Sequence, residues 1–169
     1  MKKLTLIRHA KSDWSNVTLS DFERPLNTRG KKAARTMGRR MAVRKDVPEL
    51  LISSPAKRAR KTARSLAKEL GIDREAIEYR KEIYDASREN LIDLVHALPE
   101  QTDIALVGHN PGLTELAAWL CPDAPEWLPT CAVLQLELQI DAWDEAGPGC
   151  GRVRDYDYPK KKDSELEAG

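Results

Sequence analysis

The chain has 169 residues, of which 41% are hydrophobic, enough to bury the core of one ordinary domain and short for two. Its 28 basic and 27 acidic side chains leave a net charge of +1, which argues against a nucleic-acid-binding protein and against a protein held to a membrane surface by charge. No apolar run approaches the ~20 residues that cross a bilayer, so no membrane partner is expected. We also expect the protein to be a monomer.

The positive charge is concentrated in one stretch of the chain. Residues 29–68 contain 14 Lys and Arg side chains against two acidic ones, a local net charge of +12. The solvated outer faces of two amphipathic helices explain most of this excess, although such a surface can also steer phosphorylated or acidic partners. A nucleic-acid-binding role for the stretch is disfavoured because it lacks interleaved aromatic residues.

Strand and helix signals alternate along most of the chain. Short apolar runs predict strands, and apolar residues at helical spacing predict helices. The expected strands cover residues 3–7, 50–53, 76–79, 104–108, 132–138 and 151–158. The expected helices begin at Asn27 or Thr28, at Ser54 with Pro55 in the first turn, at Arg88 and at Pro111, and the last three end at Gly71, at Leu98 and near Leu120.

This β-α-β-α-β-α-β order predicts an α/β fold with three layers, in which helices cover both faces of a mainly parallel sheet and a late antiparallel strand pair completes it. Right-handed crossovers place the loops after the first, second and fourth strands along one edge of the sheet. Residues 1–159 are expected to form a single domain. Residues 160–169 carry too little apolar content to pack, so a flexible tail is expected there.

Three cysteines, Cys121, Cys131 and Cys150, are widely spaced without a CxxC pair, and no secretory leader precedes the first predicted strand. We expect free, buried thiols and a cytoplasmic location.

Two of the predicted strands run directly into a histidine, the first into Arg8-His9 and the fourth into His109. Arg58 follows the second strand. Open α/β folds bind ligands at the carboxyl ends of their strands, so these four side chains are expected to converge. Two arginines and two histidines without a thiolate or a carboxylate cage indicate a phosphate pocket with no metal and no cofactor.

The chemistry of these groups assigns each of them a role. An imidazole attacks phosphorus only while one ring nitrogen is unprotonated, and neighbouring guanidinium charges disfavour the imidazolium. Arg8 and Arg58 would bind the phosphoryl oxygens and help to keep His9 neutral. The helix that begins near Asn110 can turn its free backbone amides to the same anion. We therefore expect His109 to be a phosphate ligand and not the attacking group.

Three motifs that contain these residues resemble those of the histidine phosphatase superfamily, the phosphoglycerate-mutase-like enzymes, whose signature is a strand ending in Arg-His-Gly. The matching segments here are Arg8-His9-Ala10, residues 53–63 and residues 107–112. The stretches LIRHAKSDW, ERPLNTRG and VGHNPGL are most similar to the SixA-type branch of phosphohistidine phosphatases. The resemblance implies a phosphoglycerate-mutase-like fold and a phosphohistidine intermediate on His9, with Arg8, Arg58 and His109 holding the phosphoryl group.

The chain departs from the family pattern at several positions. Ala10 stands where many members have Gly, and Ser15 where many relatives carry Asn. Ser15 and Asn110 are further candidates for binding the phosphoryl group. The candidates for the general acid are Glu82, Asp85 or neither, because an imidazole leaves from phosphohistidine with less help than an alkoxide leaves from an ester.

The expected function is a metal-independent phosphatase that acts on phosphohistidine in a partner protein. The interval from residue 80 to residue 103 has room for one helix, so no large lid is expected, and an open pocket suits a phosphoryl group presented on a protein. The alternatives are a phosphatase of the same superfamily that acts on small phosphorylated metabolites and a non-catalytic phosphate-recognition module.

Overall fold

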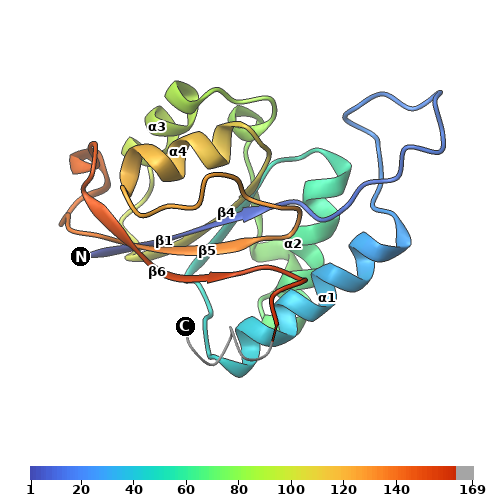
Figure 1. The fold of residues 1–169 in the computed structure, drawn as a ribbon, viewed down its shortest axis with the longest axis horizontal. Coiled ribbons are helices and arrows are strands. Elements are labelled where there is room, and N and C mark those ends of the chain that lie inside the picture. Colours follow the sequence, from blue (N-terminus) through green and yellow to red (C-terminus); the bar gives the residue numbers. More distant parts are fainter. Residues whose placement is uncertain (163–169) are drawn as a thin grey trace.

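The computed structural model describes residues 1–162, which form a six-stranded sheet with helices on both faces (Figure 1). The strands are β1 (Lys2–Arg8), β2 (Leu50–Ser53), β3 (Glu78–Tyr79), β4 (Asp103–Gly108), β5 (Val133–Leu138) and β6 (Gly151–Asp157). The α-helices are α1 (Thr28–Val43), α2 (Lys57–Leu70), α3 (Arg88–His96) and α4 (Gly112–Leu120), and the short 3₁₀ helices are η1 (Arg74–Ala76), η2 (Lys81–Ile83) and η3 (Trp143–Glu145). None of the helices in this part of the chain is long and apolar enough to span a membrane.

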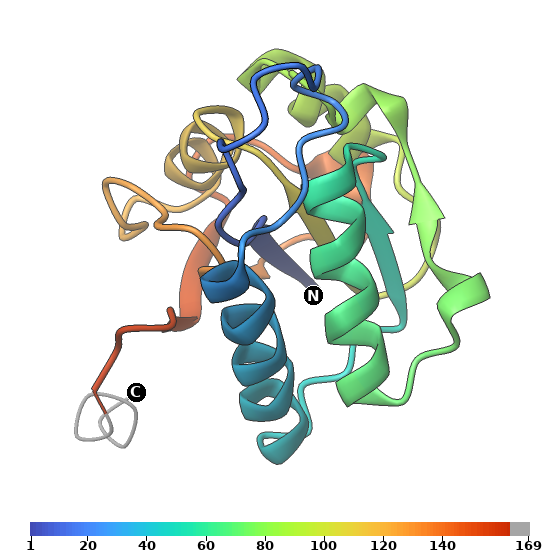
Figure 2. The same cartoon turned by 90° about the vertical axis from the view of Figure 1, so that its right-hand side faces the viewer.

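The sheet has the strand order β3-β2-β4-β1-β5-β6. Its first four strands are parallel, β5 is antiparallel to β1, and β6 is antiparallel to β5. The helices α3 and α4 bury one face of the sheet and α1 and α2 bury the other, where Figure 2 shows the two helices side by side. The predicted three-layer α/β fold with a late antiparallel pair is confirmed.

Two of the predicted helix ends are confirmed by their capping contacts, and the predicted start of the second helix is wrong. The Asn27 side chain caps α1 by accepting from the N–H of Gly30, and Gly71 ends α2 in the left-handed conformation. The second helix, expected to start at Ser54-Pro55, starts at Lys57. The N–H of Ser54 donates to the carbonyl of Val107 in β4. Ser54 therefore still extends the sheet, and the helix can begin only after it.

Smaller differences concern the third strand, the third helix and the cysteines. Residues 74–76 form η1, which shortens the predicted strand 76–79 to Glu78–Tyr79. The third helix ends at His96, two residues before the predicted end. All three cysteines are free, and two are buried, but Cys150 is only half-buried.

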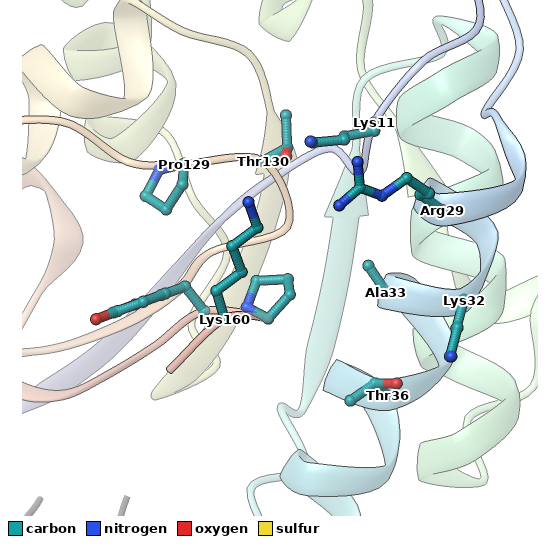
Figure 3. A pocket seen from close by; sticks show the side chains of 10 residues that line it. Lys11, Arg29, Lys32, Ala33, Thr36, Pro129, Thr130 and Lys160 are labelled. Carbon is teal, nitrogen blue, oxygen red and sulfur yellow. The ribbon is translucent and has the colours of Figure 1, made fainter. Parts of the chain in front are cut away.

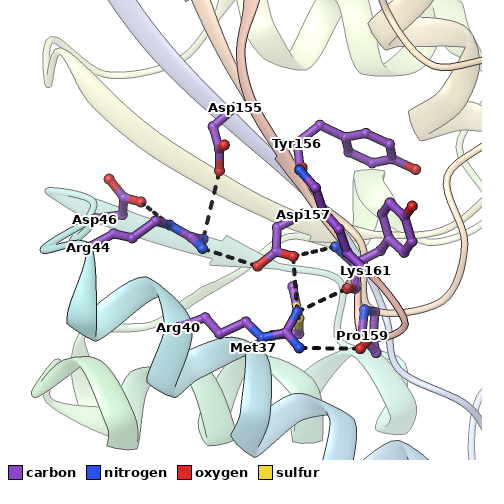
Figure 4. Close-up of polar contacts among 10 residues, drawn as sticks. Met37, Arg40, Arg44, Asp46, Asp155, Tyr156, Asp157, Pro159 and Lys161 are labelled. Carbon is purple, nitrogen blue, oxygen red and sulfur yellow. Dashed lines mark hydrogen bonds and ion pairs between the residues drawn. The ribbon is translucent and has the colours of Figure 1, made fainter. Parts of the chain in front are cut away.

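A buried ion-pair cluster fastens the end of β6 to α1 (Figure 4). Asp157 is 0% exposed, and its carboxylate pairs with Arg40 at 3.0 Å and with Arg44 at 3.1 Å. Arg40 also donates to the backbone carbonyls of Tyr158 and Pro159. The segment that follows β6 is therefore held against α1.

The predicted tail, residues 160–169, lies mostly beyond the described residues. Within the part that is described, the ammonium group of Lys161 donates to the carbonyl of Tyr156. Residues 163–169 lie outside the described residues.

Candidate active site

Three parallel strands end at one edge of the sheet and bring the residues that follow them together. β1 and β4 are in register with Arg8 beside Gly108, and β2 pairs with the other side of β4. The backbone of His9 is held from both sides, because its N–H donates to the carbonyl of Gly108 (3.0 Å) and its own carbonyl accepts from Cys131 (3.1 Å). His9 and His109 therefore leave neighbouring strands at the same point, where open α/β folds bind ligands.

The His9 ring is buried in a state that suits nucleophilic attack. Its Nδ1–H donates to the carbonyl of Ala10 at 2.7 Å. Because a carbonyl oxygen only accepts, Nδ1 carries the proton and the lone pair of the neutral ring lies on Nε2. Burial lowers the pKa of His9 to about 3, and the positive charges of Arg58 and Arg8 act in the same direction. His9 is thus neutral at pH 7.

The His109 ring lies 5.2 Å from the His9 ring, measured between centroids. Its Nε2 is 2.8 Å from the hydroxyl of Ser54, which also accepts from the N–H of Ala56. The hydroxyl proton is free to point to Nε2, which leaves a proton on Nδ1, and Nδ1 is buried without a partner. Burial lowers the pKa of His109 to about 4. The His109 ring is therefore neutral at pH 7, and its Nδ1–H is a donor without a partner.

The two arginines are held in the same way. In each, a terminal guanidinium nitrogen donates to a backbone carbonyl, and Nε has no partner. Arg8 Nη1 donates to the carbonyl of Leu128 at 3.0 Å. Arg58, which is 5% exposed, donates from Nη1 to the carbonyl of Asp21 at 2.7 Å and from Nη2 to its carboxylate at 3.1 Å. The Nε atoms of both arginines are buried without a partner. Arg60 and Arg64 on α2 also have an unpaired buried Nε. Arg8, Arg58 and His109, by contrast, lie close enough to His9 to lower its pKa, so their unpaired donors can bind the oxygens of a phosphoryl group there.

Asp21 is a site residue that the sequence did not reveal. Its carboxylate accepts from Arg58, from Arg24 (2.6 Å) and from the hydroxyl of Tyr84 (2.6 Å). Partial burial raises its pKa, but these hydrogen bonds outweigh burial and hold the pKa well below its usual range. Asp21 therefore stays ionised, so it positions Arg58 and cannot supply a proton. Asp21 lies in the irregular loop between β1 and α1, where no periodic pattern marks it.

Known proteins share this fold. The family model described as the histidine phosphatase superfamily (branch 1) matches residues 4–87. The structure of the proposed phosphohistidine phosphatase SixA from Agrobacterium tumefaciens is 30% identical in sequence, with a TM-score of 0.78 over 94% of this chain and 98% of that one. The chain belongs to the histidine phosphatase superfamily, within its SixA-type branch.

Two further relatives of this histidine phosphatase extend the comparison. A structure of the protein histidine phosphatase SixA complexed with tungstate has a TM-score of 0.78 at 23% identity and covers 93% of this chain and 97% of its own. An uncharacterised chloroplastic protein of Arabidopsis thaliana is 30% identical over 161 residues, which are 88% of this chain and 73% of that protein. The phosphoglycerate-mutase-like fold expected from the sequence is thereby confirmed.

The remaining predicted site residues of this histidine phosphatase lie apart from the two histidines or are engaged elsewhere. The Asn110 amide donates to the carbonyl of Leu128 and accepts from Thr114, so it supports the segment that also tethers Arg8. Ser15 is exposed, and its N–H donates to Asp13. Glu82 is exposed in η2 and has no hydrogen bond or ion pair to any described residue. The parts that Ser15 and Glu82 play in binding and catalysis stay predictions.

We expect both histidines of the candidate site to stay neutral between about pH 7 and pH 5, because burial holds their pKa values at about 3 and about 4. Long-range ¹H–¹⁵N NMR should show that His9 is protonated on Nδ1, and that neither the His9 ring nor the His109 ring titrates in this range. An unfolded histidine binds a proton near pH 6.5. The unfolded state then holds more protons, so the free energy of unfolding should fall as the pH drops from about 6.5 toward 4. Titration of the His9 ring near pH 6.5 would contradict the assignment.

Proposed function

We propose that this histidine phosphatase hydrolyses phosphohistidine in a partner protein through a covalent phosphohistidine intermediate on its own His9. One observation carries the proposal. The free Nε2 of a neutral His9 lies in one site with the unpaired donors of Arg8, Arg58 and His109. A neutral nucleophile beside donors for three phosphoryl oxygens is the arrangement that phosphoryl transfer requires.

The reaction has two displacements at phosphorus. In the first, the Nε2 lone pair of His9 forms a bond to phosphorus, while the bond to the substrate imidazole breaks and its electron pair leaves with that nitrogen. In the second, water attacks the phosphoryl group, the bond to Nε2 breaks, and inorganic phosphate leaves with the oxygen of water while the proton passes to solvent. Arg8, Arg58 and His109 stabilise the charge on the phosphoryl oxygens in both steps.

The acidic residues near the site favour a nitrogen leaving group over an alkoxide. Asp21 is held as a carboxylate by its three donors, and Glu82 and Asp85 are exposed. An alkoxide needs a proton as it leaves, whereas an imidazole needs less help. In addition, α3 is the one α-helix between β3 and β4, so this interval supplies no separate helical lid over a small substrate. Phosphorylated small metabolites are the alternative substrates.

A kinetic comparison on two substrates tests the substrate class. Glu82→Gln and Asp85→Asn should each change turnover of a phosphohistidine protein by less than about twofold. If either residue is the general acid for esters, its substitution should slow hydrolysis of an alkyl phosphate on the order of 10²-fold. Asn suits position 85 because its φ of 53° lies in the left-handed region. Efficient turnover of a sugar phosphate with negligible action on phosphohistidine would show that the substrates are small phosphorylated metabolites.

A further inference from the structure

A cavity of about 600 Å³ lies between α1 and the segments before β5 and after β6 (Figure 3). We call it the basic cavity, because Lys11, Arg29, Lys32 and Lys160 line it and, within residues 1–162, none of its lining residues is acidic. Figure 3 shows the cationic ends of Lys11, Arg29 and Lys160 turned toward one another near Thr130, while Lys32 points away along α1. Three positive groups from three distant parts of the chain thus face one space.

These three cations have no partner among residues 1–162. Within residues 1–162, none of Lys11, Arg29 and Lys160 forms an ion pair or a side-chain hydrogen bond. Toward the end of α1, by contrast, Arg40 and the C-cap residue Arg44 are both paired with Asp157. Like charges gathered without a counter-charge repel one another, and an anion relieves that repulsion. The basic cavity therefore has the electrostatics of an anion-binding site.

The walls of the basic cavity are fixed in place. The Asp157 cluster holds the segment that carries Lys160 against α1. At the other end, a Cβ atom on Gly30 would lie 2.1 Å from the carbonyl oxygen of Lys11, so α1 and the Lys11 backbone approach as closely as glycine allows. A cavity whose walls are already ordered loses little conformational entropy when a ligand binds.

The basic cavity adjoins the reaction centre. Lys11 is two residues beyond His9, and Thr130 precedes Cys131, whose N–H donates to the His9 carbonyl. A second cavity of about 490 Å³ on the other flank of α1 is also lined by basic residues, among them Lys31 and Arg35. The two cavities together form a positive surface that is larger than one small anion can cover. A surface of this size suits a protein with several acidic side chains better than it suits a small metabolite.

We propose that the basic cavity binds acidic side chains of the phosphorylated partner protein while its phosphoryl group lies at His9. The inference rests on the proposed function for the identity of the partner. The carboxylates of the partner would pair with Arg29, Lys160 and Lys11, so that substrates with acidic residues near the phosphorylated histidine are preferred.

The test uses the full chain, the double variant Arg29→Gln/Lys160→Gln and a matched control, Arg64→Gln/Arg74→Gln, which removes the same charge from a cavity beside α2 and changes no residue that lines either of the two basic cavities. The first measurement is the affinity for a fluorescent glutamate-rich peptide without a phosphoryl group, by anisotropy. The cavity variant should weaken binding on the order of tenfold, and the control by less than about twofold. Equal losses in both variants, or none in either, would overturn the proposal.

The second measurement compares kcat/KM on two phosphohistidine peptides, one with acidic flanks and one with neutral flanks. The preference for acidic flanks should fall on the order of tenfold in the cavity variant and persist in the control. Binding of the glutamate-rich peptide without turnover of either phosphopeptide would reject the proposed function and leave the cavity assignment standing. Turnover without any preference for acidic flanks would reject the cavity assignment alone. Equally tight, cavity-dependent binding of an RNA oligonucleotide would also overturn the proposal.

Discussion

Replacement of His9 by alanine should lower kcat on a phosphohistidine substrate on the order of 10⁴-fold or more, because it removes the atom that we propose forms the bond to phosphorus. In the wild-type enzyme, rapid quenching with substrate labelled in the phosphoryl group should trap an acid-labile, base-stable adduct on His9. The adduct should be absent from His9→Ala. Folding of the variant is checked by near-UV circular dichroism.

The matched control for this experiment is His109→Ala. That substitution removes the donor that we propose binds the phosphoryl group and leaves Nε2 of His9 in place, so the loss should be smaller, on the order of 10²-fold to 10³-fold. The labelled adduct should still form on His9. Hydrolysis by His9→Ala at the wild-type rate, or an adduct on His109, would refute the proposed mechanism.

Replacement of Asp157 by alanine should lower the free energy of unfolding by about 3 kcal/mol. Its buried carboxylate accepts from Arg40, from Arg44 and from the N–H of Tyr158, and the substitution removes this acceptor from all three donors. The two arginine side chains are 23% and 29% exposed and recover some hydration, which places the expected loss at the lower end for a buried pair. Urea unfolding followed by tryptophan fluorescence measures it.

Asp155→Ala is the control for the buried cluster. Asp155 lies 3.9 Å from Arg44, and its side chain is 21% exposed, so its removal should cost less than about 1 kcal/mol. If the two variants unfold at the same urea concentration, the Asp157 cluster does not stabilise the fold in the way its burial indicates.

The strand ends were predictable from the sequence because their signals are local. An apolar run that stops at a histidine marks both a strand and the residue that leaves it, so the order of residues alone places Arg8, His9 and His109 at one sheet edge. The cap at Asn27 was predictable for the same reason.

The rest of the site depends on contacts between distant segments. Asp21 reaches Arg58 from a loop of irregular sequence, and Tyr84 reaches Asp21 from the turn after η2. The residues around Ser54 predict a helix cap. In the structure its N–H extends the sheet, and its hydroxyl forms a hydrogen bond with His109. Neither propensity nor spacing contains information about such partners, since tertiary contacts override both.

The pairing of Arg8 with Gly108 makes His9 and His109 neighbours in only one alignment of the two strands. A slip of one residue would turn every side chain of the shifted strand to the opposite face of the sheet and separate the two rings. The loop after β1 is closed by the bridge between Ser12 and Leu26, and its exposed tip includes Val17, which is 92% exposed. Length changes during evolution can therefore accumulate at this tip, whereas an insertion within either strand would separate the two histidines of the candidate site.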